Sequence, residues 1–373
     1  MALGLRQAGH EVRLLCPPSV VGRLWPSAGG IGKWLGHGDK LGLFPAVLRY
    51  AIRDTDVVHI CDHSNAIYTK YLGPVPLVVT CHDLLGIRSA LGEIPLSPTS
   101  WTGRILQGMV LQGLKQAQHV ACVSDSTRCD LLRIARVAQQ RVSVVYNSLN
   151  YPYSPMVTSE AKVRLSKLRV DANQRFILHV GGNQWYKNRL GVLRIFSILR
   201  KFPAVDAPHL VMVGQPWTAE MRRFISENRL SEITKELVGI SNEDLRALYS
   251  TAQMMLFPSF YEGFGWPIVE AQACGCPVAI PDEPPMNELG GNAAVYIDAR
   301  QPGSAALALK RALHNVSHLR QRSIANAARF RSGMIDSYLA LYKRVVVEKS
   351  GATIREPDVA LARQSGCSAN GVR

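Results

Sequence analysis

The sequence predicts an α/β protein built from two Rossmann-like, doubly wound domains. Short runs rich in β-branched residues alternate with helical patterns along most of the 373 residues. These runs are continuously apolar, which is typical of strands in parallel sheets that helices cover on both faces. They also fall into two series, separated by the Asn-, Ser- and Pro-rich stretch "NSLNYPYSP" (147–155), which is typical of a linker. A chain of this length is too long for one typical core.

The predicted strands of the first series are "EVRLLC" (11–16), "VVHIC" (57–61), "LVVTC" (77–81), "HVACVS" (119–124) and "VSVVY" (142–146). Those of the second series are "FILHVGG" (176–182), "HLVMVG" (209–214), "MMLFPS" (254–259), "PVAI" (277–280) and "AAVYID" (293–298). The opening "MALGLRQAGHEVRLL" predicts a helix and then a strand, with no strand and glycine-rich turn before them. A doubly wound sheet normally begins with that strand, so we expect either that the coding start lies upstream of Met1 or that the first domain has lost its first strand.

Three helical patterns help to place the domain boundaries. Ser241 is a predicted N-cap for a helix over 241–252, and Phe330, Met334, Tyr338, Leu341 and Val345 are spaced for one helical face. The pattern over 104–119 predicts an amphipathic helix on the first sheet, with a membrane-surface element as the alternative. We expect a first domain over 1–150, a second over 151–328, and a helix over 329–348 that can cross back to the first domain. Residues 349–373 are polar and unpatterned, which predicts a disordered tail.

Composition limits the function classes. Lys and Arg exceed Asp and Glu by 43 to 28, so the net charge of +15 favours a polyanionic partner such as a nucleotide phosphate or an anionic membrane. Nucleic acid is not expected, because aromatic residues make up only 7% and no basic-aromatic platform occurs. No apolar run is long enough to span a membrane and the start does not resemble a signal peptide, which predicts a cytoplasmic protein.

The eight cysteines lack the spacing of a disulfide framework. Cys16, Cys61, Cys81 and Cys122 fall in or at the end of apolar runs, where buried reduced thiols are usual. Cys274-Gly-Cys276 is too closely spaced for a zinc finger, and no metal site is expected.

The stretch "SFYEGFGWPIVEAQACGCPV" (259–278) carries the strongest chemical signal. It follows a predicted strand, at the carboxyl edge where open α/β sheets bind ligands. Gly263 and Gly265 permit a sharp turn, and Pro267 suits the first turn of a helix whose free N–H groups can bind an anion. Glu262 precedes the turn, and Glu270 lies one turn inside the helix, where it can accept hydrogen bonds from two ribose hydroxyls.

The segment from 258 to 298, beginning "PSFYEGFGWPIVEAQACGCPV", resembles the donor-site signature of the retaining glycosyltransferases of family 4 (group 1 glycosyltransferases), which have the two-domain GT-B fold. Other segments are similar to the same family in order: "AGHEVRLL" (8–15), "VVTCHD" (78–83), "ACVSDST" (121–127), "ILHVGGNQWYKN" (177–188) and "NEDLRALYSTAQMMLFPS" (242–259). The resemblance covers residues 2–345 and implies that the two domains face a cleft.

The resemblance implies a role for each matching residue of the second domain. Glu262 would contact the donor sugar and support charge at its anomeric carbon, and Glu270 would bind the nucleotide ribose. The backbone of Gly263, Phe264 and Gly265 would bind sugar or phosphate oxygens, and Lys187 would neutralise the leaving phosphate.

One position departs from the family pattern. Where the family usually has an arginine after Val-Gly, this chain reads Val180-Gly181-Gly182. The backbone amides of Gly181, Gly182 and Asn183 are expected to substitute in part, and Arg189 is a nearby replacement.

The acceptor side is predicted in the first domain. His82 ends a strand and resembles the family's histidine that faces the donor sugar, with Asp83 beside it. His59, Asp62 and His63 follow another strand and are expected to line the acceptor cleft. Asp54-x-Asp56 superficially resembles the metal-binding motif of a different transferase fold, but it precedes a strand as a polar turn.

The resemblance implies a metal-independent hexosyl- or mannosyltransferase that uses a UDP-, GDP- or ADP-sugar and needs no cofactor. Its product would belong to polysaccharide or glycolipid assembly, with a glycan or lipid-linked acceptor and peripheral contact with the inner face of an anionic membrane. The alternative is a non-catalytic GT-B descendant that binds a nucleotide sugar or a partner protein without turnover, which the missing first strand and Gly182 favour.

Overall fold

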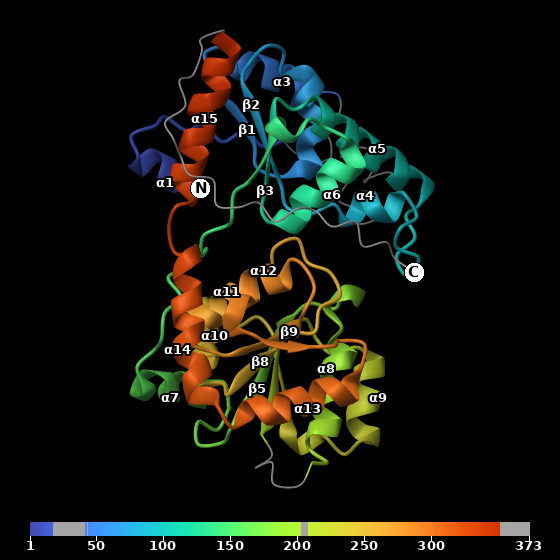
Figure 1. The fold of residues 1–373 in the computed structure, drawn as a ribbon, viewed down its shortest axis with the longest axis vertical. Coiled ribbons are helices and arrows are strands. Elements are labelled where there is room, and N and C mark those ends of the chain that lie inside the picture. Colours follow the sequence, from blue (N-terminus) through green and yellow to red (C-terminus); the bar gives the residue numbers. More distant parts are fainter. Residues whose placement is uncertain (18–41, 43, 203–207, 351–373) are drawn as a thin grey trace, which may run out of the picture. The chain divides into compact units, whose positions relative to one another are not determined.

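The computed structural model describes residues 1–17, 42, 44–202 and 208–350. The chain divides into two compact units (Figure 1). Unit 1 contains the chain up to Tyr146 together with helix α15 (Met334–Ser350), and unit 2 contains Asn147–Gly333. The expected tail from 351 onward lies outside the described residues, whereas residues 349 and 350 belong to α15.

Unit 1 contains a four-stranded parallel sheet in the order β1-β2-β3-β4. Its strands are β1 (Val58–Ile60), β2 (Leu77–Cys81), β3 (His119–Cys122) and β4 (Val142–Val144). Its other helices are α1 (Ala2–Gln7), α3 (Phe44–Ala51), α4 (Leu85–Ala90), α5 (Trp101–Gln116) and α6 (Asp125–Ala135), with the 3₁₀ segments η3 (His63–Tyr71) and η4 (Gln139–Arg141). Asp54 and Asp56 are exposed in the turn before β1, as predicted.

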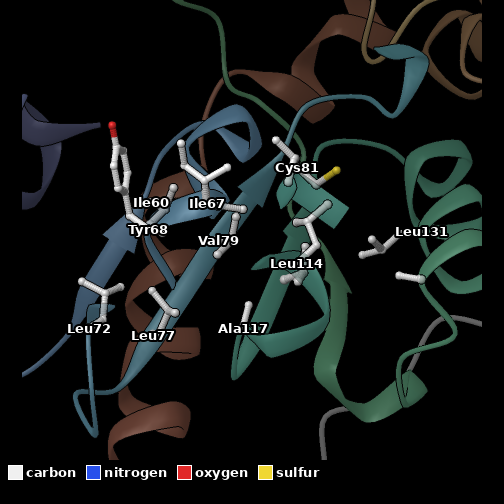
Figure 2. Close-up of a cluster of buried hydrophobic side chains, with 14 of the residues drawn as sticks. Ile60, Ile67, Tyr68, Leu72, Leu77, Val79, Cys81, Leu114, Ala117 and Leu131 are labelled. Atoms are coloured by element: carbon white, nitrogen blue, oxygen red, sulfur yellow. The ribbon is translucent and has the colours of Figure 1, made fainter. Parts of the chain in front are cut away.

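The main core of unit 1 lies between the sheet, η3 and α5. Val79 and Cys81 of β2 pack there with Leu114 of α5 and Leu131 of α6 (Figure 2). Gly113 allows α5 to approach η3 closely, because a Cβ at this position would lie 1.9 Å from the carbonyl oxygen of Ala66. The predicted amphipathic helix therefore packs on the sheet as expected, through its C-terminal half.

Helix α15 belongs to unit 1. Its side chains Tyr338, Leu341 and Val345 pack with Val78 and other residues on the face of the sheet opposite the main core. The prediction that Phe330 shares this helical face is wrong, because α15 begins only at Met334, after Gly333 with a φ of +97°. Phe330 lies in a 3₁₀ turn of unit 2.

Unit 2 contains a six-stranded parallel sheet in the order β10-β9-β8-β5-β6-β7. The strands are β5 (Phe176–Gly181), β6 (His209–Gly214), β7 (Thr234–Leu237), β8 (Met254–Leu256), β9 (Val278–Pro281) and β10 (Val295–Ile297). After β5 the chain forms β6 and β7 on one side of β5. It then crosses to the other side, where β8 pairs with β5 and is followed outward by β9 and β10. The switch point of this doubly wound sheet therefore lies between β5 and β8.

The helices of unit 2 are α7 (Thr158–Lys167), α8 (Arg189–Leu199), α9 (Ala219–Glu227), α10 (Asn242–Thr251), α11 (Trp266–Ala273), α12 (Met286–Gly290), α13 (Pro302–Leu313) and α14 (Val316–Ala327). Its 3₁₀ segments are η5 (Trp185–Lys187), η6 (Ser231–Ile233), η7 (Gly291–Ala293) and η8 (Ala328–Phe330). Ser241 caps α10, as predicted, by accepting the Asp244 amide at 3.1 Å.

Besides the position of Phe330, the structure differs from the sequence analysis at four points. The strand expected over 11–16 is not formed; Leu14 and Leu15 are exposed, and an extended segment needs a neighbouring strand for its backbone hydrogen bonds. The sequence analysis missed β7, a short edge strand that carries Lys235 and Glu236.

The stretch 147–155 is part of unit 2, where Tyr153 is buried with its ring against Tyr249. Of the thiols expected to be buried, Cys81 and Cys122 are buried, whereas Cys16 and Cys61 are exposed. Within the described part of the chain, no helix is long and apolar enough to cross a membrane.

Candidate active site

The loops that follow β5 and β8 bring the two most informative motifs together. The two strands are hydrogen-bonded neighbours, with Ile177 opposite Met254, so the segments leaving their carboxyl ends start side by side. The Asn188 side chain joins the segments by donating from Nδ2 to the carbonyl oxygen of Pro258 at 3.1 Å. The motifs "GGNQWYKN" and "SFYEGFG" therefore meet at the switch point of the sheet.

Lys187 and Glu262 form a bidentate ion pair at this point. The ammonium Nζ of Lys187 donates to both carboxylate oxygens of Glu262, at 2.7 and 2.9 Å. Both side chains are largely shielded from water, with exposed fractions of 17% for Lys187 and 8% for Glu262. Nζ also lies 5.3 Å from the centre of the Phe257 ring. The site thus places a cation and a carboxylate in contact in a partly dry environment, where their interaction is stronger than in water.

The glycine turn leads into α11 as the sequence predicts. Gly265 is the N-cap, with a φ of +108°, and Pro267 occupies the first turn of the helix. A helix start of this kind presents unpaired backbone N–H groups that suit an anion. The Phe264 side chain points into the core, where it is buried between the rings of Trp266 and Phe330. Phe264 can therefore offer a ligand its backbone only.

Glu270 lies inside α11 and is buried. The hydroxyl of Tyr249, from α10, donates to its Oε2 at 3.1 Å. Burial raises the pKa of Glu270 to about 7, and the Tyr249 hydrogen bond opposes this shift. A buried carboxylate with one protein partner retains acceptor capacity for further hydroxyl groups.

The Gly181–Asn183 segment is held by the loop that follows β6. The backbone amide of Asn183 donates to Oε1 of Gln215 at 2.8 Å, and its side chain donates to the carbonyl oxygen of Pro216. The Asn183 amide is therefore engaged within the protein, contrary to its expected availability for a phosphate. Gly214 has a φ of +144°, and a Cβ there would lie 2.0 Å from the Gly181 carbonyl oxygen, so only glycine fits at this close approach.

Arg189 is buried at the start of α8. Its Nη1 donates to the Gln215 carbonyl oxygen at 2.7 Å and also contacts Oδ1 of Asn183. Burial lowers the pKa of Arg189, and Glu236 opposes the shift. The guanidinium of Arg189 thus connects the loops after β5 and β6.

The residues that the sequence predicts for the acceptor side lie in unit 1, at the carboxyl ends of the neighbouring strands β1 and β2. His82 Nε2 is 2.8 Å from the carbonyl oxygen of Cys61, and its backbone amide donates to Nδ1 of His63 at 3.4 Å. Burial lowers the pKa of His63. Asp62 and Asp83 accept backbone amides of Ser64 and Leu85, at 2.8 and 2.9 Å. The structure therefore brings His63, His82 and the two aspartates together.

His59 differs from these residues because both of its ring nitrogens are engaged. Nδ1 is 2.6 Å from the Tyr342 hydroxyl and Nε2 is 2.7 Å from Oγ1 of Thr80. Burial lowers its pKa to about 4, which keeps the imidazole neutral. In this structure His59 links β1 to α15.

Sequence reasoning missed two residues that shape the site, Tyr249 and Gln215. Tyr249 falls in the helix predicted over 241–252, where an aromatic residue is most simply interpreted as part of the core. Gln215 is a single polar residue after a strand. No local pattern distinguishes either. Among the described residues, no group of three or more His, Cys, Asp or Glu side chains could hold a metal ion.

Comparisons with known proteins agree with this architecture. The family model for glycosyl transferases group 1 matches residues 163–330, and the model for Glycosyltransferase Family 4 matches residues 1–151. The O-antigen chain mannosyltransferase B of Escherichia coli is 28% identical over 196 residues, which cover 52% of this chain and 51% of that protein. A D-inositol 3-phosphate glycosyltransferase of Mycolicibacterium smegmatis is 27% identical over 304 residues, covering 78% of this chain and 66% of the relative.

The matched segments span about half to two thirds of the length of these curated relatives. Solved structures show the fold. Sucrose-phosphate synthase from Thermosynechococcus elongatus has a TM-score of 0.67 at 19% identity, covering 82% of this chain and 78% of that one. Anabaena HepE in complex with UDP has a TM-score of 0.66 at 17% identity, covering 84% of both chains. With both halves matched by the family models, the chain belongs to glycosyltransferase family 4, the group 1 glycosyltransferases of GT-B fold.

Proposed function

We propose that the protein is a retaining glycosyltransferase that moves a hexosyl or mannosyl unit from a nucleotide-diphosphate sugar to an acceptor hydroxyl. The observation that carries the proposal is the contact between Lys187 and Glu262 beside the start of α11. The pair supplies a cation for a diphosphate and a carboxylate for a sugar, and the start of α11 adds backbone N–H groups for the diphosphate. Both lie at the edge of the sheet where such folds bind ligands. The relative named as a mannosyltransferase and the neighbour with bound UDP support this donor class.

The residues divide the donor between them. Glu270, buried below the helix start, accepts hydrogen bonds from the ribose hydroxyls. Lys187 and the amides of Gly263 and Gly265 bind the diphosphate, and Glu262 turns toward the sugar and stabilises positive charge at its anomeric carbon. Gly181 and Gly182 let the backbone approach the phosphates, and Asn183 fixes their loop through Gln215. His82, with His63, Asp62 and Asp83 beside it, serves the acceptor side.

The transfer proceeds by front-face substitution and requires no metal or other cofactor. The bond between the anomeric carbon and the leaving phosphate oxygen breaks, and a bond to the acceptor oxygen forms on the same face. The acceptor proton passes to the leaving phosphate, whose negative charge Lys187 and the start of α11 stabilise. The acceptor is a glycan or a lipid-linked glycan, and the protein contacts an anionic membrane peripherally.

The test is a panel of UDP-, GDP- and ADP-sugars, assayed for hydrolysis and for transfer, with and without a metal chelator. We expect turnover of at least one donor, unaffected by the chelator, and its loss in Glu262→Ala and Lys187→Ala. Glu227→Ala, which removes an exposed carboxylate of α9, is the matched control. Unchanged rates in Glu262→Ala and Lys187→Ala would refute these roles. Binding of a nucleotide sugar without turnover would instead identify a non-catalytic descendant, the alternative that Gly182 and the engaged Asn183 amide favour.

A further inference from the structure

Tyr249, in α10, is fully buried in unit 2. The hydroxyl of a buried tyrosine needs a hydrogen-bond partner, because it has lost its contact with water. That partner is Glu270, whose Oε2 accepts the hydroxyl at 3.1 Å. Glu270 is also buried and lies in α11, the helix that begins at the glycine turn. One polar contact inside unit 2 therefore joins α10 to the carboxylate of the candidate donor site.

This hydrogen bond fixes one oxygen of the Glu270 carboxylate. A glutamate side chain rotates about several bonds, and ordering it when a ligand binds costs conformational entropy. The contact with Tyr249 limits these rotations before a ligand arrives. A carboxylate offers about four acceptor positions on its two oxygens, so Oε1 and the second lone pair of Oε2 remain for other hydroxyl groups. Tyr249 therefore leaves Glu270 able to accept from two neighbouring hydroxyls while restricting its orientation.

A second tyrosine holds the ring of Tyr249. The ring of Tyr153, from the stretch 147–155, packs edge-to-face against it, with the two ring centres 5.8 Å apart. Tyr153 is itself buried. Its stretch is tied to α10, where Nε of Arg246 donates to the carbonyl oxygen of Ser154 at 2.9 Å. Aromatic pairs in this geometry are stabilised beyond the area that they bury, so Tyr153 limits the movement of Tyr249.

The ionisation of Glu270 depends on the same contact. Burial raises the pKa of Glu270 to about 7, and the hydrogen bond from Tyr249 opposes this shift. Three titratable groups interact electrostatically with Glu270: Tyr249, Tyr153 and Cys274. Burial raises the pKa of each of the three, so all of them are neutral at pH 7. Removing the Tyr249 hydroxyl therefore leaves burial unopposed and raises the pKa of Glu270 further.

The helices α10, α12 and α14 pack against α11 and also carry titratable side chains. Nη1 of Arg320, from α14, donates to the carbonyl oxygen of Gly275 at 3.1 Å, and Arg246 is held at Ser154. The pKa of Glu270 responds to burial and to Tyr249 rather than to these described charges. The full set is Glu243, Asp244 and Arg246 of α10, Glu288 of α12, and His318, Arg320 and Arg322 of α14.

We propose that Tyr249 is a positioning residue for nucleotide binding. It holds the Glu270 carboxylate in the orientation in which both ribose hydroxyls can donate to it, and Tyr153 in turn holds Tyr249. The proposal rests on the proposed function, in which Glu270 accepts the ribose hydroxyls. In this arrangement neither tyrosine contacts the nucleotide, and both act through Glu270. Their effect should therefore appear in the affinity for the nucleotide and in the pH dependence of that affinity.

The experiment is isothermal titration calorimetry of the full chain with UDP, GDP and ADP, from about pH 6 to about pH 9. For the nucleotide that the parent binds, we expect Tyr249→Phe to bind about fivefold more weakly at neutral pH. The difference should shrink at the alkaline end, where Glu270 is ionised in both proteins, so the midpoint of the pH profile moves to higher pH. The nucleotide titrates alike in both measurements, so the shift reports on the protein.

Further variants test whether Tyr249 acts through the carboxylate. Because Glu270→Gln cannot ionise, adding Tyr249→Phe to it should shift no midpoint. Tyr153→Leu, which removes the packed ring, should weaken binding less than Tyr249→Phe does, and Tyr153→Phe, which keeps the ring, should bind as the parent does. The matched control is Tyr338→Phe in unit 1, which removes the hydroxyl of another buried tyrosine, 2.7 Å from Oγ1 of Thr80, and should change neither affinity nor midpoint.

Two calorimetric outcomes would overturn the proposal. Tyr249→Phe could bind as tightly as the parent at every pH, or it could lose the same factor at every pH, which would show that the hydroxyl serves packing alone. Circular dichroism of each variant distinguishes a loss of binding from a loss of folding.

Thermal melts without nucleotide separate this proposal from the proposed function. The pH range in which Glu270→Gln gains stability should extend further above neutral pH when Tyr249→Phe is also present, because the pKa of Glu270 is then higher. An unchanged range would overturn the role of Tyr249 even if the protein binds a nucleotide. A parent that binds none of the three nucleotides would instead refute the proposed donor site, and the melts would still report on the Tyr249–Glu270 contact.

Discussion

The ammonium of Lys187 bridges both oxygens of the Glu262 carboxylate, 75 residues along the chain, at 2.7 and 2.9 Å. In the proposed function the same ammonium binds the leaving phosphate and the carboxylate serves the sugar. A diphosphate would therefore compete with Glu262 for Lys187, and the pair would have to separate or rearrange when the donor binds.

The first prediction concerns this competition. We expect Glu262→Gln to bind UDP or GDP several-fold more tightly than the parent, because a neutral amide competes less well for the ammonium. Lys187→Ala should lose at least about tenfold in the same affinity, since it removes a charge-assisted hydrogen bond. Isothermal titration calorimetry with the free nucleotides measures both.

Turnover should fall in both variants. Nucleotide affinity and turnover should therefore change in opposite directions only in Glu262→Gln. Lys201→Ala, which removes an exposed lysine after α8, is the control for a general loss of positive charge. Weaker nucleotide binding in Glu262→Gln would contradict the competition.

The second prediction uses the buried Glu270, whose pKa burial raises to about 7 from an ordinary value of 4.5. The folded state then holds a proton that the unfolded state releases, so stability falls as pH rises from about 4.5 to 7. We expect Glu270→Gln to be more stable than the parent at pH 8, by up to about 3 kcal/mol, with the gap closing toward pH 5. Thermal melts across this pH range measure the effect.

The same substitution should weaken nucleotide binding at pH 8, because in the proposed function the amide replaces the carboxylate that accepts the ribose hydroxyls. A variant that is more stable but binds the nucleotide more weakly is expected when a ligand-binding residue lowers the stability of the fold. Glu227→Gln, on the exposed side of α9, should change neither quantity. A stability difference between Glu270→Gln and the parent that does not change with pH would show that the burial of Glu270 does not control its ionisation.

The third prediction compares two glycines of α5. A Cβ at Gly113 would meet the carbonyl oxygen of Ala66 at 1.9 Å, whereas nothing lies within 4 Å of a Cβ at Gly108. Gly113→Ala should therefore destabilise the protein by about 1–3 kcal/mol through overpacking. Gly108→Ala should stabilise it by about 0.5–1 kcal/mol, because alanine favours the helix. Urea unfolding measures both, and equal effects would contradict the close packing of α5 on η3.

Some of the fold followed from local patterns, and some did not. Continuous apolar runs predicted nine of the ten strands found among the described residues, because a strand buried on both faces needs apolar residues throughout. The charged edge strand Thr234–Leu237 lacked that pattern, and the run 11–16 had the pattern without a neighbouring strand. Tyr153 looked like part of a linker because a turn-rich segment gives no indication that its aromatic ring is buried against Tyr249.

The sequence by itself determined the family, the glycine turn before α11 and the residue types of the candidate donor site, because these depend on short-range spacing. Only the tertiary structure decided which groups are engaged. It paired Lys187 with Glu262, used the Asn183 amide for Gln215, and enclosed His59 between Thr80 and Tyr342. It also packed α15 against the sheet of unit 1. Each of these contacts joins residues that are distant in sequence, and the order of the strands, which no local pattern encodes, brings them within hydrogen-bond range.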